Sequence, residues 1–453
     1  MEPLLKTDWP VAPSADHFLV RARGSTTARE VIAGFTTFGA MSYILAVNPA
    51  ILSAAGMDYS QLVIVTALAS AIGTLIMALW ANLPIALAPG MGNNIIFAQI
   101  VVLRLGVTPG VALAMVLVNA ILFLTLSLTG WREKIVRGFP APIRLGIQSA
   151  LGLFIAWIGL KNSGLLILQQ SGVAIAPLST PAAIFAYVAV LLTLLLVACR
   201  VPAALLASIV IVTVIGTIVP DGHGDHLTHL PTQLLAWPTV PTKLFFLIDL
   251  PGLASNILTT FPVLLYLFVS DFFGVTATLV GLTSRAGLSD DEGNMLSCRE
   301  AYAADGIASA IGAVLGTSTV GVYVESATGV AAGGRTGLTG VVVAGLFALS
   351  VFAWPLILVI PPQAVAPALL VVGILMLESL GELDMTQEEN SYPPLLMIVL
   401  AACTTDLVMS LASGCFLYTG IVVLKRKRES LTAVLIGLDL AFLLYIALAS
   451  RVA

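Results

Sequence analysis

Two carboxylates stand inside apolar stretches that are long enough to cross a membrane. Asp271 follows a run of mostly bulky apolar residues in LLYLFVSDFFGVTATLVGL, and Glu325 lies within TSTVGVYVESATGVAAGG. An acid at bilayer depth costs about 2.5–3.5 kcal/mol on insertion scales, so such residues usually face a cavity and bind a substrate or an ion. Burial disfavours the ionised form of an acid, so either side chain could take up and release a proton. The structural alternative is an acid held by hydrogen bonds between helices.

The third and tenth apolar segments are predicted to be broken helices. Pro84, Pro89 and Gly92 would interrupt a helix in ANLPIALAPGMGNNIIFAQIVVL. In the later segment, GTSTVGVYV is β-branched and punctuated by glycine, and a helix can begin at ESATGVAA. Each segment should therefore be extended first and helical afterwards. Irregular backbone at this depth persists only where protein buries it or where it lines a cavity. The alternative is a pair of kinked packing helices.

Polar residues stand where each half-helix would begin. Asn93 and Asn94 begin the first, and Glu325 and Ser326 begin the second. Two helix N-termini with free N–H groups would then meet near the midplane, which is a ready site for a polar ligand. Carboxylates accept hydrogen bonds from ring N–H groups, amides both donate and accept, and an aromatic ring such as that of Phe273 can stack. Together these groups suit a flat heterocycle that carries ring N–H groups.

The composition places the whole chain in a membrane. Of 453 residues, 58% are hydrophobic and only 10% are charged, whereas soluble domains average about 25% charged residues. The apolar segments are about 17–25 residues long and show no alternating barrel pattern, so they should be helices. A net charge of −4 without a basic stripe excludes a nucleic-acid partner. The sequence predicts an all-α polytopic protein embedded in the lipid bilayer, and no motif indicates a cofactor.

The apolar segments form two series of seven. A polar stretch at 220–243 separates them, and a further apolar stretch at 431–450 could cross the membrane, lie against the bundle or dip and return. Arg21, Arg23 and Arg29 predict that the N-terminus lies in the cytoplasm. Because seven spans reverse the orientation of the second series, the two halves should form an inverted repeat, as in many transporters. The fourteen predicted segments lie at 31–52, 61–82, 85–103, 108–129, 141–160, 181–199, 202–219, 253–283, 300–315, 318–333, 338–359, 363–380, 393–404 and 406–424.

Five motifs together resemble one transporter family. They are MSYILAVNPAILSAAGMD, NLPIALAPGMGNN, SDFFGVTATLVGL, AYAADGIASAIGAVLGTSTVGVYVESATGVAAGGRTGLTG and IPPQAVAPALLVVGILM. From about residue 26 to residue 425, the chain is similar to the AzgA-like purine permeases of the nucleobase/ascorbate transporter superfamily. The resemblance implies proton symport of adenine, guanine or hypoxanthine into a bacterial cell across the inner membrane. It also implies a fourteen-span inverted repeat and a homodimer formed through one domain.

The same resemblance divides the chain into a core domain that carries the substrate and a gate domain against which the core moves. Its boundaries, applied to this sequence, give a cytoplasmic N-terminal segment at 1–29, core parts at 30–130 and 253–359, gate parts at 131–219 and 360–428, an external linker at 220–252, and an extra apolar segment at 429–453.

The substrate of such a permease would lie between crossed strands of segments 3 and 10. By position, the resemblance implies substrate contact from Asp271, Glu325 and Asn94, with both acids also coupling transport to protons. Backbone amides near Gly92 and Tyr323 would help to hold the base. Asn93, Ser326 and Phe273, chosen above from the residues alone, complete the expected site.

The chain departs from the family at the expected pocket. The eighth segment of the family usually reads D-x-F-D-T, whereas this chain has Gly274 and Val275 in place of the second acid and the threonine. Asn93 stands where the family tends to have a small or apolar residue. These changes leave open a neighbouring heterocycle, of the uracil or xanthine type, as the substrate.

Other readings of the sequence receive less support. Asp305, in AADGIAS, is interpreted as a helix-packing residue rather than a substrate contact. His223, His226 and His229 with Asp221 and Asp225 could ligate a metal, but a solvated loop is favoured. An anion exchanger of the same fold should avoid two acids in its pocket. A membrane-embedded enzyme with Asp271 and Glu325 as an acid pair would be expected to carry a recognisable catalytic motif such as HExxH or GxGD in its membrane segments, and those segments contain none.

Overall fold

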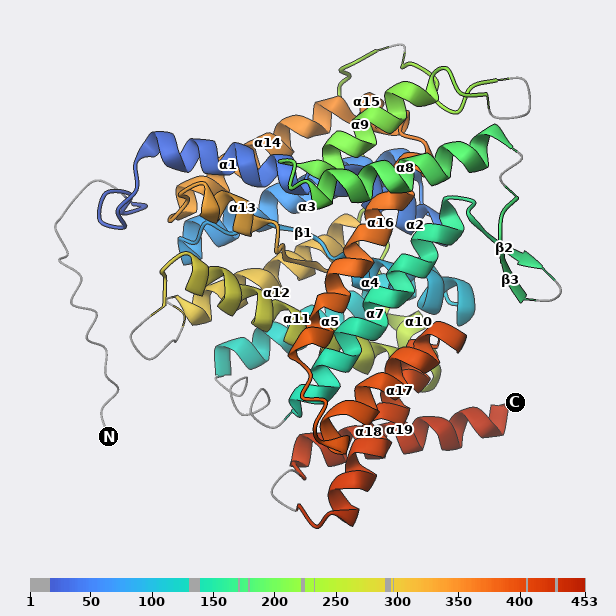
Figure 1. Ribbon diagram of the computed structural model, residues 1–453. Coiled ribbons are helices and arrows are strands. Elements are labelled where there is room, and N and C mark those ends of the chain that lie inside the picture. Colours follow the sequence, from blue (N-terminus) through green and yellow to red (C-terminus); the bar gives the residue numbers. More distant parts are fainter. Residues whose placement is uncertain are drawn as a thin grey trace.

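The computed structural model describes residues 17–129, 139–169, 172–177, 180–220, 225–231, 233–289, 295, 297–404, 406–427 and 431–452 (Figure 1). The chain is almost entirely helical, and nine helices of the described part are long and apolar enough to cross a membrane. The elements of the first half are α1 Thr27–Met41, α2 Ile44–Leu52, η1 Ser53–Ala55, α3 Tyr59–Ile76, η2 Met77–Ala81, β1 Leu87–Pro89, α4 Met91–Ile95, η3 Ile96–Arg104, α5 Pro109–Thr129, α7 Ala141–Asn162, β2 Leu166–Gln169, β3 Gly172–Ile175, α8 Pro181–Ala198 and α9 Ala204–Gly216.

The second half repeats this order. A short helix precedes it, and both halves contain a helix followed by a three-residue strand and a half-helix. Its elements are α10 Leu250–Ser255, α11 Ile257–Arg285, α12 Cys298–Leu315, β4 Val320–Val322, α13 Ser326–Ala331, α14 Gly337–Ser350, η4 Val351–Ala353, α15 Trp354–Leu358, α16 Pro362–Leu377, η5 Glu378–Glu382, α17 Glu388–Thr404, α18 Leu407–Leu424 and α19 Ala433–Val452. The all-α architecture with two seven-segment series, predicted from the sequence, is confirmed.

The two predicted broken segments are also confirmed, and their strands pair with each other. β1 and β4 run antiparallel, with Leu87 opposite Val322 and Pro89 opposite Val320. Beyond the strands, the Gly90 N–H donates to the Thr319 carbonyl at 2.9 Å. This pairing satisfies backbone groups that lipid could not satisfy, which is why extended chain is tolerated at this depth.

Hydroxyl groups from the preceding helices complete the backbone hydrogen bonding of both strands. Thr74 of α3 bonds to the N–H and C=O of Leu87, at 2.9 and 3.0 Å. Ser309 of α12 does the same for Val320, at 3.2 and 2.9 Å. The two halves of the chain therefore support their strands in matching ways.

Glycine lets these helices approach the strands closely. A Cβ at Gly312 of α12 would stand 2.6 Å from the Ser318 carbonyl, and a Cβ at Gly73 of α3 would stand 3.1 Å from the side chain of Val320. The first distance is too short for a methyl group, so a larger residue at Gly312 would push α12 away from the crossing. The second distance is tight, and a methyl group at Gly73 would require a small shift of Val320.

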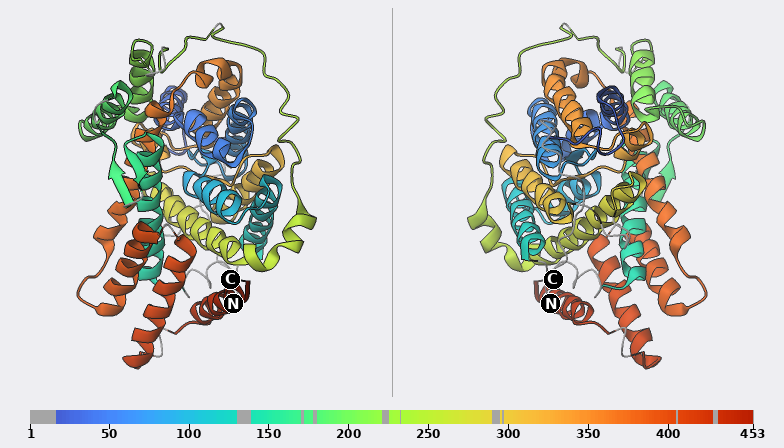
Figure 2. Two further views of the ribbon diagram at one scale, coloured as in Figure 1. Left: turned by 90° about the vertical axis from the view of Figure 1, so that its right-hand side faces the viewer. Right: turned by 90° about the vertical axis from the view of Figure 1, so that its left-hand side faces the viewer.

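The helices form two groups on either side of α11. In the first, called here the crossing group, α1, α3, α5, α12 and α14 pack around the two broken segments. In the second, the flanking group, α7, α8, α9, α16, α17 and α18 pack on one another. Figure 2 shows the flanking group on one side of the molecule and the crossing group on the other. α11 contacts members of both groups, including α5, β4, α7 and α18.

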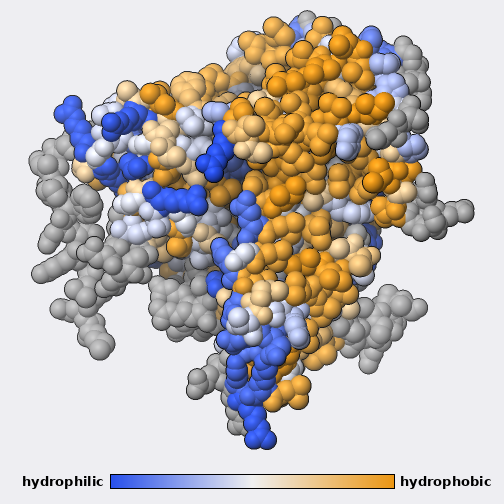
Figure 3. Space-filling view, in the orientation of Figure 1, coloured by the Kyte–Doolittle hydropathy of each residue, from blue (hydrophilic) through white to orange (hydrophobic). Residues whose placement is uncertain are grey.

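A wide apolar surface covers the flanking group. Figure 3 shows hydrophobic side chains gathered over α8, α9 and α16. Leu195 of α8 and Val214 of α9 are more than 60% exposed. A water-soluble protein rarely exposes so large an apolar area, whereas a multi-pass membrane protein presents such a face to lipid tails.

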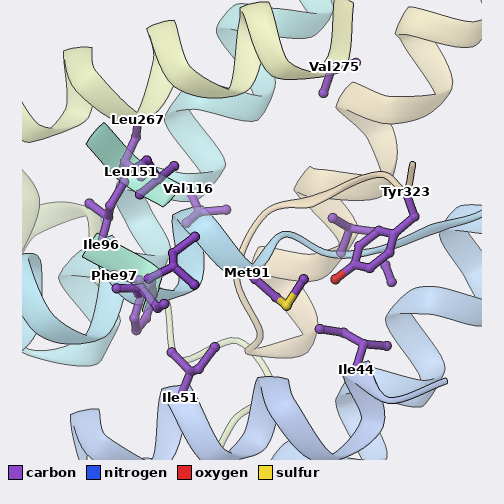
Figure 4. Close-up of a cluster of buried hydrophobic side chains, with 14 of the residues drawn as sticks. Ile44, Ile51, Met91, Ile96, Phe97, Val116, Leu151, Leu267, Val275 and Tyr323 are labelled. Carbon is purple, nitrogen blue, oxygen red and sulfur yellow. The ribbon is translucent and has the colours of Figure 1, made fainter. Parts of the chain in front are cut away.

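The crossing is embedded in a continuous apolar core. Figure 4 shows Met91 beside Tyr323 and Ile44 on one side and Ile96 and Phe97 on the other, all within the same cluster of buried side chains. This packing holds the half-helix that begins at Met91 rigidly against its neighbours.

One feature was not expected from the sequence: a short hairpin, β2 paired with β3, follows α7. The apolar stretch after residue 430, for which the sequence left three possibilities open, forms α19, which packs on α11 and α18. In the loop after α9, His229 lies 3.7 Å from Asp225, while Asp221 and His223 fall outside the described residues. Within the described residues, no group of three or more His, Cys, Asp or Glu side chains is placed to hold a metal ion.

Candidate functional site

A cavity of about 320 Å³ lies where the broken segments meet α11 and the flanking group. One wall comes from the first half-helix, from α11 and from β4, and the opposite wall comes from α7 and α16. The lining residues are Gly90, Gly92, Asn93, Gln148, Leu151, Ser270, Asp271, Gly274, Val275, Thr278, Gly321, Val322, Leu375 and Met376. Its volume falls at the small end of the range for ligand pockets, which suits a small ring compound.

Asp271 and Asn93 are bonded to each other at this cavity. The Asn93 side-chain amide donates to Asp271 Oδ1 at 3.0 Å and to the Thr319 hydroxyl at 2.9 Å. A carboxylate has about four lone-pair positions, so Asp271 can still accept a hydrogen bond from a ligand. The structure thus brings together one predicted acid and one predicted amide.

Asn94, one residue later, points away from the cavity into a fully buried network. Its amide donates to Asn48 Oδ1, and its oxygen accepts from the Ser318 hydroxyl. Asn48 in turn donates to Thr66 and Thr317, at 2.6 and 3.0 Å. The network ties α2 and α3 to both broken segments. In this conformation Asn94 holds the crossing together, and Asn93 is the asparagine that lines the cavity.

The polar residues at the start of the second half-helix bond to Tyr43 and to the first broken segment. The Tyr43 hydroxyl donates to Glu325 Oε1 at 2.6 Å, and Ser326 Oγ accepts from the Ala86 N–H at 3.0 Å. The Tyr323 N–H donates to the Ala86 carbonyl at 3.0 Å, and its hydroxyl donates to Pro89 O at 2.6 Å. Glu325, Ser326 and Tyr323 are not among the described residues that line the cavity.

Phe273 packs beside the cavity rather than into it. Its ring lies 4.4 Å, centroid to centroid, from that of Phe139, and the Arg144 guanidinium stands 5.6 Å from its centre. Arg144 belongs to α7, so this contact joins α11 to the flanking group.

Residues 28–411 match the model of a family described as the Permease family (Xan_ur_permease). Over 430 residues the chain is 36% identical to the adenine permease AdeP of Escherichia coli strain K12, with 95% of each chain covered. It is also 36% identical to the guanine/hypoxanthine permease PbuG of Bacillus subtilis strain 168, covering 93% of this chain and 97% of that protein.

The chain belongs to this permease family. It is therefore a membrane transporter and not an enzyme, so the acid-pair enzyme considered above is set aside. The transmembrane domain of the cyanobacterial bicarbonate transporter BicA shares its fold, with a TM-score of 0.63, 15% identity, and coverage of 85% of this chain and 96% of that one.

The departures of this permease from the D-x-F-D-T motif lie on the cavity wall. Gly274 and Val275 both line the cavity. A Cβ added at Gly274 would meet no atom within 4 Å, so the absence of a second acid there leaves space in this permease. That space enlarges the pocket beside Asp271.

Asp305, interpreted from the sequence as a packing residue, lies close behind β4. It is fully buried on α12, one helical turn before Ser309. A Cβ at Gly321 would stand 3.8 Å from Asp305 Oδ1 and 3.9 Å from Asp271 Oδ1. The two carboxylates therefore both lie within 4 Å of the same point beside the strand.

Gln148 is one of the polar lining residues that sequence reasoning missed, together with Ser270 and Thr278 of α11. It lies on α7, far from both broken segments in the sequence, within an ordinary-looking apolar helix. The only available signal was a polar side chain in the apolar run IRLGIQSALGLFIAW.

Proposed function

We propose that this permease imports purine nucleobases, namely adenine, guanine or hypoxanthine, across the bacterial inner membrane together with protons. The observation that carries the proposal is the small cavity in which Asp271 and Asn93 meet beside the paired strands. A carboxylate that accepts N–H groups, next to an amide that can donate and accept, complements the edges of a purine. The names of the adenine and guanine/hypoxanthine permeases that the chain matches agree with this chemistry.

The proposed transport cycle uses the two helix groups as core and gate, with residues 30–130 and 253–359 in the core. The cavity lies between them, so a movement of one group against the other would open it to one side of the membrane and then to the other. The N-terminus would be cytoplasmic, and the exposed apolar face of the flanking group would contact lipid or a second copy of the chain.

Asp271 and Glu325 are the proposed proton-coupling residues, and Asp305 adds support. Two carboxylates near one point in a low-dielectric interior strongly disfavour simultaneous ionisation. We therefore propose that this pair of acids carries one proton when the cavity is empty, and that a base that donates to Asp271 competes with it.

A second candidate substrate is a heterocycle of the uracil or xanthine type. Gly274 favours this alternative because it removes an acid from the pocket wall and leaves room there. If this candidate is correct, Gly274→Asp will raise the preference for adenine, guanine or hypoxanthine over uracil and xanthine.

The test is uptake of radiolabelled adenine, guanine, hypoxanthine, xanthine and uracil into proteoliposomes, with and without an inward proton gradient. Gradient-driven accumulation of a purine that a protonophore abolishes would support the proposal. Asp271→Asn, close in size to the wild-type side chain, is the matched control and should give background uptake. Equal uptake with and without the gradient would refute the coupling to protons, and uptake of uracil alone would refute purine nucleobases as the substrate.

A further inference from the structure

Among the described residues, Gln148 is the amide-bearing side chain on the cavity wall formed by the flanking group. α7 contributes Gln148 and Leu151, and α16 contributes Leu375 and Met376. Leu151 is buried and packs against Gly92, where an added Cβ would come within 2.6 Å of it. Gln148 is partly exposed to the cavity space. A ligand held by Asp271 on one wall therefore meets an amide on the other.

We propose that Gln148 binds the six-position edge of the purine while Asp271 accepts a ring N–H on the opposite wall. The inference rests on the proposed purine transport and names the residue that would bind the purine from the opposite wall. A glutamine amide presents one donor group and one acceptor side by side. The six-position edge of a purine also presents one donor and one acceptor side by side.

This pairing works with both kinds of purine because the amide can turn over. Adenine offers an amino donor next to a ring-nitrogen acceptor, and glutamine pairs with such an edge through two hydrogen bonds. Hypoxanthine offers a carbonyl acceptor next to an N1–H donor, which the amide meets after a half-turn about its last bond. Gln148 therefore admits 6-amino and 6-oxo purines alike, and discrimination between them is weak in the wild-type permease.

Replacing the amide by a carboxylate removes this tolerance. A glutamate at this position can only accept when ionised. Guanine presents two adjacent donors, N1–H and the 2-amino group, and so pairs with a carboxylate through two hydrogen bonds. Hypoxanthine presents one donor there, and its carbonyl oxygen would face the carboxylate. Gln148→Glu should therefore favour guanine over hypoxanthine by about tenfold or more, since a good bidentate pair discriminates by about 1–3 kcal/mol.

The experiment measures competition by unlabelled adenine, guanine and hypoxanthine against a labelled purine in proteoliposomes. Gln148→Leu, which keeps the approximate size of the side chain, should weaken all three bases without changing their order. Gln148→Glu should move guanine to the first place. Gln363→Glu, on α16 but not among the lining residues, is the matched control and should keep the wild-type ratios.

Folding of each variant is checked by monodisperse elution in detergent before reconstitution. A milder variant, Gln148→Asn, keeps the amide but shortens its reach, and should weaken binding if the larger changes fail to fold. Unchanged affinities and ratios in all three Gln148 variants would overturn the proposal. If instead the wild-type permease takes up no purine, the proposed function fails first, and that result is read from the unmutated protein alone.

Discussion

The two broken segments share a backbone plan and differ in how their polar side chains are placed. In each, a three-residue strand is bonded by a hydroxyl from the preceding helix, Thr74 for β1 and Ser309 for β4. After β1, Asn93 turns to the cavity and meets Asp271. After β4, Glu325 turns instead to Tyr43. The two halves of the inverted repeat thus share the backbone arrangement of the site, while each half supplies different polar side chains.

The helices that support the strands, α3 and α12, also differ one helical turn before Thr74 and Ser309. Four residues before Thr74 stands Ser70, which bonds to its own helix at the Thr66 carbonyl. Four residues before Ser309 stands Asp305, whose carboxylate, like that of Asp271, lies within 4 Å of the point where a Cβ at Gly321 would stand. At these matching positions, the first half of the chain therefore contributes a neutral hydroxyl group, and the second half contributes an ionisable carboxyl group. We expect the proton-linked steps to depend mainly on residues of the second half.

The largest effect is expected for Asp271→Asn. This change removes the acceptor that we assign to the substrate and keeps the size of the side chain. Hydrogen bonds to charged groups contribute about 1.5–3 kcal/mol, so affinity should fall roughly 10- to 100-fold, and proton-driven accumulation should cease. Exchange of labelled for unlabelled base across the membrane measures the affinity, and gradient-driven uptake measures the accumulation. Wild-type exchange in this variant would remove Asp271 from the substrate site.

Glu325→Gln should abolish proton-driven accumulation and reduce exchange less than Asp271→Asn does. The reason is its position: Glu325 bonds to Tyr43 rather than lining the cavity in this conformation. Tyr43→Phe is the matched control, because it removes the same hydrogen bond and leaves the acid in place. Full proton-driven uptake by Glu325→Gln would refute its coupling role.

Asp305→Asn should lose accumulation while retaining exchange of adenine or hypoxanthine at close to the wild-type rate. The neutral amide keeps the packing on α12 but cannot carry the shared proton. Ser70→Ala, at the matching position of the first half, should leave accumulation intact. If Asp305→Asn accumulates substrate normally, the contrast between the two supporting helices is only structural.

Asn94→Ala and Asn93→Ala should separate stability from binding. Asn94→Ala removes the donor to Asn48 Oδ1 and the acceptor of the Ser318 hydroxyl in a buried network, which should cost about 1–3 kcal/mol of stability. Asn93→Ala should instead raise the KM for uptake with little change in melting temperature. Thermal unfolding in detergent measures the stability of each variant, and uptake kinetics measure its KM. A lowered melting temperature for Asn93→Ala together with a raised KM for Asn94→Ala would contradict the roles assigned to these two residues.

The smallest effect is expected for the paired hydroxyls. Thr74→Val and Ser309→Ala each remove the side-chain partner of one strand residue, at matching positions of the two halves. Each should lower stability by a similar amount, about 1–2 kcal/mol. A large difference between their melting temperatures would show that the two halves do not support the crossing equally.

Most of the backbone arrangement was predictable from the sequence, because the residues that indicate it lie within the same short segments. Prolines and glycines before Asn93, and the β-branched run before Glu325, indicate where the helices break. The position of Asp271 within α11 follows from hydrophobic context alone. The site residues themselves remain predictions, although the structure shows which of them share a cavity.

The direction in which individual side chains point could not be predicted from the sequence. Adjacent helical residues point about 100° apart, so only the three-dimensional packing decides that Asn93, and not Asn94, meets the cavity. The same holds for Gln148 and Asp305, because no local pattern tells which turn of α7 or α12 meets the crossing. The direction of Asn93, for example, depends on contacts with Asp271 and Thr319, which lie 178 and 226 positions later in the chain.

The pairing of β1 with β4 also governs how the protein can be made. The Ala86 N–H finds its acceptor in Ser326, 240 positions later in the chain. At about 5–20 residues per second of synthesis, that partner appears roughly 10–50 s after the first strand has left the ribosome. During this time the exposed backbone of residues 86–90 cannot rest in lipid unpaired. The first half must wait in a sheltered or incompletely inserted state, so biogenesis of this permease should be sensitive to the supply of membrane insertion factors and to truncation before the tenth segment.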